Sequence, residues 1–312
     1  MNNIICIAGP TASGKTALAA TLAKELNGEV VSCDSMQVYR RMDIGTAKPT
    51  LEEMQGIPHH MIDVAEPWED FSVSRYCDMA APIVDDILSR GKTAVIAGGT
   101  GLYMDSLIRG NAFAPFPATG VRERLEAQAD TVGMEVMLSQ LRSVDPDAAG
   151  RLHLSDRKRI LRALEVWYET GETITQHDHR TRQQPPRYRA AYIGLSFQDR
   201  AQLRRRIDLR VDEMVRQGLL EEVQALLAAG LPPTATAWQA IGYKQFLAAA
   251  DGRCTVTEAI EEVKLRSRQY AKRQLTWLRR NPDIHWILWG EEPNFPRGLQ
   301  NATEYLTALG LR

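Results

Sequence analysis

The segment GPTASGKT, Gly9–Thr16, constrains the fold of this chain more than any other. It follows an apolar run, residues 3–8, and precedes residues 16–26, in which leucines recur at helical spacing. Two glycines that frame four residues and are followed by Lys-Thr, between a strand and a helix, form the pattern that wraps backbone N–H groups around phosphates. We therefore expect an α/β sheet whose first strand ends at an anion site.

Three further apolar runs are predicted to be strands of the same sheet. They cover residues 29–33, 93–97 and 191–196. Because strands alternate with helical patterns, a parallel sheet with right-handed crossovers is expected. The first two of these runs end at Asp34 and at the segment GGTGLY, Gly98–Tyr103. Functional groups gather at the carboxyl ends of parallel strands, so Gly9–Thr16, Asp34 and Gly98–Thr100 are predicted to lie together.

The pattern becomes mainly helical between residues 112 and 189. Helices are expected there at residues 122–130, 133–144 and 154–170, and after it at residues 199–230 and 256–280. The polar run 175–189, with Pro185-Pro186, predicts a flexible return to the sheet. We predict a P-loop NTPase-like parallel sheet flanked by helices, formed by residues 1–111 and 190–312, with a smaller, mainly helical insertion domain at residues 112–189. The last twenty residues show no recognisable chemistry.

The composition is that of an ordinary globular protein. Hydrophobic residues make up 44% of the 312 residues and charged residues 25%. No apolar run approaches the roughly 18 residues of a membrane span, and none has the pattern of a signal peptide, so a cytoplasmic protein that does not bind membranes is expected. The four cysteines show no CxxC spacing, and neither His59-His60 nor His177-x-His179 has a third ligand at metal-site spacing.

Basic residues are concentrated locally although the net charge is only −1. The basic tracts are residues 156–162, 199–210 and 264–280, and the last carries seven Lys or Arg and no acid. Such tracts indicate a polyanion partner, although solvated helix faces are an equally good interpretation. The helix at residues 256–280 is predicted to pack through a separate stripe: Val256, Ile260, Val263, Ser267, Tyr270, Gln274 and Trp277.

The glycine-rich loop predicts how the anion is held. Gly9 and Gly14 permit a tight backbone path, Lys15 supplies a positive charge, and Thr16 can ligate Mg²⁺. All eight loop residues are predicted to bind the phosphates: Gly9, Pro10, Thr11, Ala12, Ser13, Gly14, Lys15 and Thr16. An NTPase would also need an acid at the end of an apolar strand, and Asp63 is only a weak candidate. This favours a transferase over a motor or switch ATPase.

Asp34 is the second candidate for the chemistry. It directly follows a predicted strand, and it heads the segment DSMQVYR. A carboxylate beside a phosphate site is electrostatically unfavourable unless it binds Mg²⁺ or accepts a proton. A capping or turn role is the alternative interpretation. The position of Asp34 beside the loop favours the catalytic role.

Eight stretches, in order along the chain, resemble the bacterial tRNA dimethylallyltransferase family, also called IPP transferases. They are GPTASGKT (9–16), DSMQVYRRMDIGTAKP (34–49), PHHMIDV (58–64), GGTGLY (98–103), RILRALEV (159–166), RIDLRVDEMVRQGL (206–219), QAIGYK (239–244) and YAKRQLTWLRR (270–280). They span nearly the whole chain, and only the first is common to other classes of enzyme. The chain differs at Arg41, where the family usually has Gly, and we expect little effect.

The resemblance implies that the loop binds the diphosphate of dimethylallyl diphosphate with Mg²⁺, and not ATP. The exocyclic N6 of the adenosine at tRNA position 37, next to the anticodon, attacks the allylic C1, and diphosphate leaves. The accepted tRNAs would read codons that begin with uridine and would bind through the anticodon stem-loop. The enzyme is expected to be a monomer.

The resemblance also implies site residues. Asp34 matches the general base, Arg210 the diphosphate-contacting arginine, and Thr100 a position near the substrates. The positions that match tRNA-contacting residues are Asp34, Ser35, Met36, Gln37, Thr100, Arg122, Lys158, Arg159, Ile160, Leu161, Arg162, Gln239, Ala240, Ile241, Gly242, Tyr243, Lys244, Lys272 and Arg273. The basic tract 264–280 would contact phosphates, which positions an RNA without reading its sequence.

Three alternatives stay open from the residues. A P-loop kinase for a nucleotide or small metabolite shares the loop, the acid after the second strand and an arginine-rich helix. A prenyltransferase could also act on free adenine nucleotides, for which the basic tracts would have no use. A non-catalytic RNA-binding protein would need no catalytic Asp34.

Overall fold

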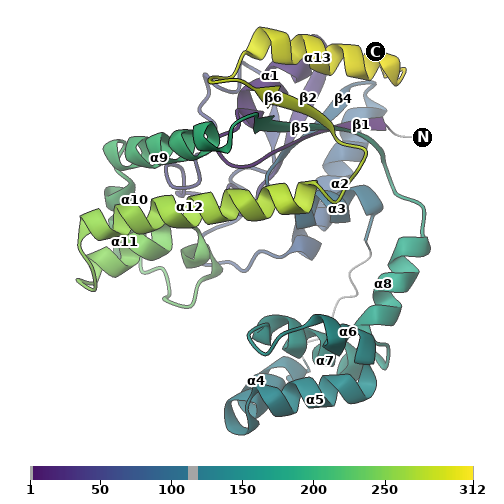
Figure 1. Ribbon diagram of the computed structural model, residues 1–312, viewed down its shortest axis with the longest axis vertical. Helices are drawn as coiled ribbons and strands as arrows, with labels where there is room; N and C mark the ends of the chain where they lie inside the picture. Colours follow the sequence, from purple (N-terminus) through teal and green to yellow (C-terminus); the bar gives the residue numbers. More distant parts are fainter. Residues whose placement is uncertain (1–2, 112–118, 312) are drawn as a thin grey trace. The chain divides into compact units, whose positions relative to one another are not determined.

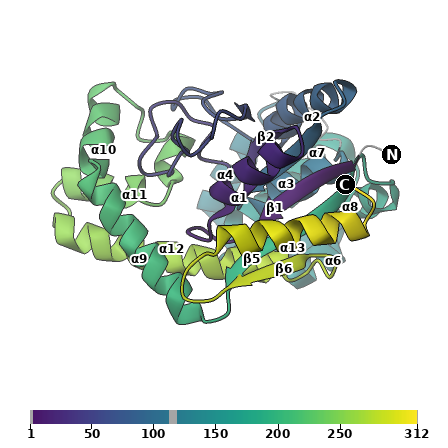
Figure 2. The same ribbon diagram turned by 90° about the horizontal axis from the view of Figure 1, so that it is seen from above.

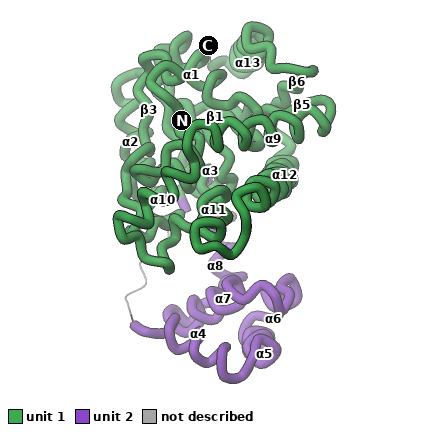
Figure 3. Tube along the Cα trace, turned by 90° about the vertical axis from the view of Figure 1, so that its left-hand side faces the viewer, with its two compact units in different colours: residues 1–110, 187–312 green, residues 111–186 purple. Residues whose placement is uncertain are grey.

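Figure 1 shows the computed structural model, which describes residues 3–111 and 119–311. Its contacts divide the chain into two compact units, residues 1–110 with 187–312 and residues 111–186, which Figure 3 shows in different colours. The sequence analysis predicted an insertion at residues 112–189, and the start of that range lies outside the described residues. The first unit contains the sheet, and the described elements of the second are all helices.

The first unit is built on a six-stranded sheet in which all neighbouring strands are parallel. The strands are β1 (Asn3–Ala8), β2 (Gly28–Cys33), β3 (His59–His60), β4 (Thr93–Gly98), β5 (Arg189–Phe197) and β6 (His285–Trp289), in the order β3-β2-β4-β1-β5-β6. The predicted P-loop NTPase-like α/β fold is confirmed. Because β1 lies between β4 and β5, the loop Gly9–Thr16 emerges in the interior of the sheet's carboxyl edge.

Helices cover both faces of this sheet (Figure 1). They are α1 (Lys15–Glu25), α2 (Val73–Ser89), α3 (Gly101–Arg109), α9 (Arg200–Arg216), α10 (Leu219–Ala228), α11 (Tyr243–Ala250), α12 (Val256–Leu278) and α13 (Phe295–Ala308), with a short 3₁₀ turn at Thr236–Gln239. Helices α1 and α13 pack together on one face and α2 and α3 on the other, whereas α9 to α12 pack against one another beside the sheet (Figure 2). Leu18 and Leu22 of α1, which are fully buried, join the strand residue Ile7 in the core.

A buried carboxylate on β2 connects this strand to β3 and to the residues that precede β4. Glu29 is 3% exposed, and its oxygens accept hydrogen bonds from both terminal nitrogens of Arg90, from Lys92 Nζ at 2.7 Å and from His60 Nε2 at 2.8 Å. Hydrogen bonds from Arg90, and then from Lys92 and His60, hold the pKa of Glu29 well below its usual value, and burial opposes them. The folded protein therefore binds a proton at Glu29 less readily than the unfolded chain does.

A Glu29→Gln variant is expected to lose about 1–3 kcal/mol of stability at pH 7, the scale of hydrogen bonds to charged groups. Since the folded-state pKa of Glu29 is depressed, its contribution is complete above the unfolded value of about 4.3 and is lost as the pH falls below it. Urea unfolding of both proteins between pH 7 and pH 3 measures this. The difference between wild type and variant should shrink toward low pH, and a constant difference would contradict it.

The second unit is a small helical domain. Its helices are α4 (Val121–Val132), α5 (Met134–Val144), α6 (Pro146–Arg151), α7 (Arg157–Thr170) and α8 (Ile174–Gln183). Met137, Leu141 and Ile160 are fully buried at its centre. This unit has a hydrophobic core of its own, which is what an independently folded insertion requires.

The prediction of a flexible return over the polar run 175–189 is wrong, because most of it forms α8. The helix starts at a capping box: Thr173 Oγ1 accepts from the N–H of Gln176 at 3.1 Å, and Gln176 Oε1 accepts from the N–H of Thr173 at 3.0 Å. This local signal was overlooked in favour of the polar composition and the two prolines that follow.

The stripe predicted on α12 is only partly correct. Val263 and Gln274 are buried, whereas Val256 and Trp277 are exposed, and Ala259, Ala271, Leu275 and Leu278 complete the buried face. Alanines carry a weak hydrophobic signal but permit close helix packing, so the pattern misplaced the contact face. None of the helices in residues 3–111 and 119–311 is long and apolar enough to cross a membrane.

Candidate active site

Three loops meet where β1, β2 and β4 end. Gly98 lies in register with both Ala8 and Cys33, so Gly9, Asp34 and the loop after Gly98 leave the sheet side by side. Thr100 links the last two, because its Oγ1 accepts a 3.1 Å hydrogen bond from the N–H of Ser35. The structure thus brings together the three segments that the sequence placed at one edge of the sheet.

The backbone of the loop Gly9–Thr16 leaves N–H groups available to an anion. A Cβ on Gly9 would lie 2.6 Å from the carbonyl oxygen of Leu195, and Gly14 adopts φ 84°, a left-handed conformation that favours glycine. Gly14 precedes α1 without a side-chain cap, and the first turn of α1 contains no acid. The positive end of the α1 dipole is therefore not neutralised by the protein's own residues at the helix start.

A buried amide connects this loop to the loop after β4. Gln274 of α12 is 6% exposed; its Oε1 accepts from the N–H of Thr11 at 3.0 Å, and its Nε2 donates to Gly99 O at 2.9 Å. Gln274 is part of the packing stripe predicted from the sequence, and its role in the site was not predicted. An amide within a mostly apolar stripe was the available signal.

Three cationic side chains converge on the loop. Lys15 Nζ donates to Pro10 O at 2.8 Å, and Arg206 Nε donates to Ala12 O at 3.4 Å. Burial, and then the neighbouring charge of Arg210, lower the pKa of Lys15 to about 7, while Asp34 opposes the shift. Burial also lowers the pKa of Arg210. A polyanion bound here would relieve the repulsion among these cations, so the cluster is suited to phosphate groups.

Asp34 has one oxygen in a turn and one without a partner. Its Oδ1 accepts from the N–H groups of Met36 at 2.9 Å and Gln37 at 3.4 Å, whereas Oδ2 has no hydrogen bond to any residue in the described part of the chain. The turn role considered from the sequence is thus present. It occupies one oxygen, fixes the carboxylate and leaves the second oxygen able to accept a proton.

Tyr270 extends the site and was missed as a functional residue. Burial, and then the charge of Asp34, raise the pKa of the Tyr270 hydroxyl to about 12, while a hydrogen bond with Thr100 lowers it. The neutral hydroxyl of Tyr270 and the hydroxyl of Thr100 therefore lie close to Asp34. These groups can orient a polar substrate without carrying charge.

The segment after Asp34 is folded back on itself by its own side chains. Gln37 Nε2 donates to Thr46 O at 3.3 Å and to Ala47 O at 3.2 Å, and Arg210 donates to the same Ala47 carbonyl at 3.5 Å. Asp63, the weak candidate for a magnesium ligand, pairs instead with Lys48. Its carboxylate is used within this segment and offers no support for an NTPase acid.

The donor set fits a magnesium ion that is bound together with a diphosphate. Thr16 supplies a hydroxyl beside the phosphate loop, and residues 3–111 and 119–311 contain no group of three or more His, Cys, Asp or Glu that could bind a metal alone. Mg²⁺ typically takes one or two protein ligands and completes its shell with water and substrate phosphates. His59 Nδ1 lies 2.9 Å from Ile57 O and His60 Nε2 lies 2.8 Å from a Glu29 oxygen, so each ring has one nitrogen engaged.

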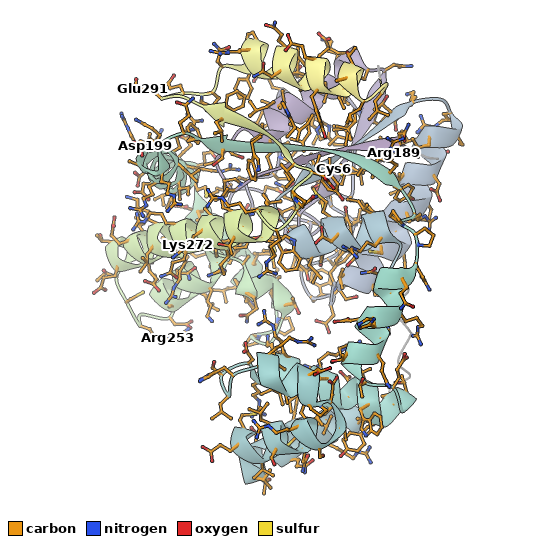
Figure 4. The ribbon with its side chains drawn as sticks, turned by 45° about the vertical axis from the view of Figure 1, so that its right-hand side comes forward. Cys6, Arg189, Asp199, Arg253, Lys272 and Glu291 are labelled. Atoms are coloured by element: carbon orange, nitrogen blue, oxygen red, sulfur yellow. The ribbon has the colours of Figure 1, made fainter. Side chains whose placement is uncertain are left out.

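The basic tract of α12 divides into a paired and an unpaired half. Lys264 pairs with Asp212 and Glu261, Arg266 with Glu262, and Arg268 with Asp208. Lys272 and Arg273, which are exposed, make no ion pair with described residues, and Figure 4 labels Lys272 on α12. Only the second half of this tract, which adjoins Tyr270 and Gln274, is available to phosphates.

The other predicted tRNA contacts of the first unit differ in exposure. Gln239 and Lys244 are exposed, whereas Ala240, Gly242 and Tyr243 are buried. The Tyr243 hydroxyl donates to Glu222, which in turn accepts from the N–H groups of residues 43–45. Tyr243 therefore supports the segment after Asp34, and its side chain is not available to an RNA.

Within the second unit, five basic residues line one pocket of about 500 Å³. They are Arg122, Arg151, Lys158, Arg159 and Arg162; the rest of the lining is one acid, Asp178, and the apolar Ala148, Leu152, Ala163 and Ile174. The side chains of Ile160 and Leu161, also predicted to contact tRNA, are in the core and pack the helix that presents this surface. A basic pocket with an apolar lining suits an unstacked nucleotide.

The chain is similar to known proteins along nearly its whole length. The sequence model of the family described as IPP transferase matches residues 37–281, more than half of the chain. The tRNA dimethylallyltransferase of a Thermoanaerobacter species is 46% identical over 305 residues, covering 97% of each chain. The enzyme of that name from Acetivibrio thermocellus is 42% identical over 312 residues, covering 100% of this chain and 99% of its own.

Solved structures show the same fold. The tRNA isopentenylpyrophosphate transferase of Bacillus halodurans superposes with a TM-score of 0.73 at 39% identity, covering 100% of this chain and 97% of its own. A eukaryotic dimethylallyltransferase, described in crystallographic snapshots as acting on tRNA, gives a TM-score of 0.82 at 30% identity, covering 99% of this chain and 79% of its own. At 39% and 30% identity, these two similarities indicate a shared family as well as a shared fold.

Proposed function

The chain belongs to the IPP transferase family, and from this membership we propose that it transfers a dimethylallyl group from dimethylallyl diphosphate to tRNA. The acceptor that we propose is N6 of the adenosine at position 37, in tRNAs that read codons beginning with uridine. We also propose that the chain acts as a monomer and in the cytoplasm. The observation that carries the proposal is the placement of Asp34 beside Lys15 and Arg210.

The cationic loop stabilises the leaving diphosphate. Negative charge builds on the diphosphate as the bond from its oxygen to the allylic C1 breaks, and fixed donors there stabilise the transition state. Lys15, Arg210 and the N–H groups at the start of α1 supply such donors. Thr16 would bind a magnesium ion, which would add positive charge beside the diphosphate oxygens.

Asp34 orients the attacking amine and accepts its proton. A neutral adenine amine is a weak nucleophile, and a positioned carboxylate that accepts its N–H directs the lone pair toward C1. The N6–C1 bond forms, the C1–O bond breaks, and the amine proton passes to Oδ2 of Asp34, which has no competing partner among the described residues. Thr100 and Tyr270, which flank Asp34, would orient the base.

The target base must leave its stack to reach Asp34, as in other enzymes that modify bases. Lys272 and Arg273 on α12 would bind tRNA phosphates, and the basic pocket of the second unit would contribute a separate contact to the same tRNA. A large polyanionic acceptor explains these surfaces, and a free adenine nucleotide does not.

The acceptor test uses dimethylallyl diphosphate and Mg²⁺ with either unmodified tRNA or AMP. Prenylated tRNA with one diphosphate released per prenyl group is expected, and AMP should react more than a hundredfold more slowly at equal concentration. Mass spectrometry of digested tRNA locates the group at N6. Equal rates with AMP would replace this proposal by a prenyltransferase for free nucleotides.

A further inference from the structure

Two aromatic residues from the C-terminal part of the chain contact the loop Gly9–Thr16. Trp289 ends β6, is 3% exposed, and donates a 2.9 Å hydrogen bond from its Nε1 to Ser13 O. Phe295 begins α13, and two of its ring carbons lie 3.1 Å from where a Cβ on Gly14 would be. The two rings meet edge to face, with centroids 5.8 Å apart.

The indole hydrogen bond fixes one peptide plane of the loop. In a trans peptide the C=O of Ser13 and the N–H of Gly14 point in opposite directions. Because the indole keeps this C=O turned toward β6, the N–H of Gly14 is turned away from β6. A loop of this kind binds phosphate through its N–H groups, so the orientation of this peptide bears on the strength of the contact.

The two rings are themselves held in place. A Cβ on Gly298 of α13 would lie 2.4 Å from the Trp289 ring, so the helix backbone packs directly on the indole. Phe295 in turn lies against Gly14, whose φ of 84° depends on the absence of a side chain. The peptide between Ser13 and Gly14 is therefore fixed by a hydrogen bond at one end and by a ring at the other.

We propose that Trp289 is a positioning residue for the diphosphate, and that β6 and α13 act together to fix the phosphate-binding loop. Trp289 acts through Ser13 and touches no substrate. The inference rests on the proposed function, because it takes the ligand of the loop to be a diphosphate. It also gives a role to the C-terminal residues in which the sequence showed no chemistry.

The test compares Trp289→Phe with Trp286→Phe. Both residues are on β6, but the Trp286 ring packs near Gly194 and makes no hydrogen bond to the loop. Trp289→Phe keeps an aromatic ring and removes the N–H donor, so a loss of about 1 kcal/mol, or about fivefold, is expected in binding. The dissociation constant of magnesium pyrophosphate and the KM for dimethylallyl diphosphate should rise by about fivefold, and the KM for tRNA by less than twofold. Trp286→Phe should leave all three unchanged.

The outcomes distinguish a failure of the proposed function from a failure of the positioning role of Trp289. If wild-type protein does not bind magnesium pyrophosphate, the proposed function fails; if it binds and Trp289→Phe binds equally well, only the positioning role fails. Equal losses for both substrates with a lower melting temperature would show a general structural role and would also overturn the inference. Should Trp289→Phe not fold, Phe295→Leu keeps the hydrogen bond and removes the ring beside Gly14, and an unchanged pyrophosphate affinity in that variant would overturn it.

Discussion

Asp34→Asn is expected to lower kcat by about three orders of magnitude, within the range for general bases, while the dissociation constant for tRNA changes less than about threefold. Asparagine keeps an oxygen that can accept from the N–H of Met36, so the turn is preserved. An amide, however, cannot accept the proton of the attacking amine. Single-turnover assays with saturating tRNA, and filter binding of the tRNA, measure the two quantities separately.

The matched control is Asp63→Asn. Asp63 lies in the same part of the first unit, pairs with Lys48 and has φ 56°, a conformation that asparagine tolerates. Its turnover should stay within about threefold of wild type. If Asp34→Asn proved as active as this control, Asp34 would be a turn residue and the proton would need another acceptor.

Arg210→Gln is expected to reduce kcat/KM for dimethylallyl diphosphate by about a hundredfold, because it removes one charged donor from the departing diphosphate. Arg210 is half-buried on α9 beside Lys15, so water replaces its charge poorly. The control is Arg205→Gln, an exposed residue of the same helix with no ion pair to described residues, which should change kcat/KM less than twofold. Steady-state rates at varied dimethylallyl diphosphate decide the matter, and similar small effects of both variants would remove Arg210 from the site.

The part of the site built on strand ends could be predicted from the sequence. The spacing of glycines, lysine and threonine in Gly9–Thr16 is typical of a loop that wraps its backbone around phosphates. Asp34 and Thr100 follow apolar runs that were predicted to be strands. A parallel sheet leaves little choice about where such residues lie. Their mutual arrangement thus follows from topology alone.

The residues contributed by distant helices could not be predicted in the same way. Gln274 of α12 and Trp289 of β6 reach the loop Gly9–Thr16 from more than 250 residues later in the chain, whereas Tyr270 of α12 lies near Asp34 and Thr100. The periodicity of Tyr270 and Gln274 is that of a packing face, because α12 does pack against other helices of its own unit, and Trp289 lies outside every strand predicted from the sequence. Only the tertiary structure distinguishes a buried amide that bonds Thr11 and Gly99 from one that fills space.

At Arg41 the chain differs from the glycine that is usual in the family, and the sequence did not show that this position has a strained backbone. The structure gives it φ 65°, a left-handed backbone in which glycine is less strained. Its guanidinium lies 5.4 Å from the centroid of the Trp68 ring and 3.8 Å from Glu66, contacts that offset part of the strain. That Arg41 has little effect on activity stays a prediction.

The central claim is that Gly9–Thr16 binds the diphosphate of a prenyl donor and not the phosphates of ATP. The most direct measurement incubates wild-type protein, Mg²⁺ and unmodified tRNA with either dimethylallyl diphosphate or ATP, and quantifies prenylated tRNA, diphosphate and ADP. Prenylated tRNA and an equal amount of diphosphate are expected with the first donor, and no ADP with the second. ADP formation from ATP, together with no prenylated tRNA from dimethylallyl diphosphate, would contradict it and identify a P-loop kinase instead.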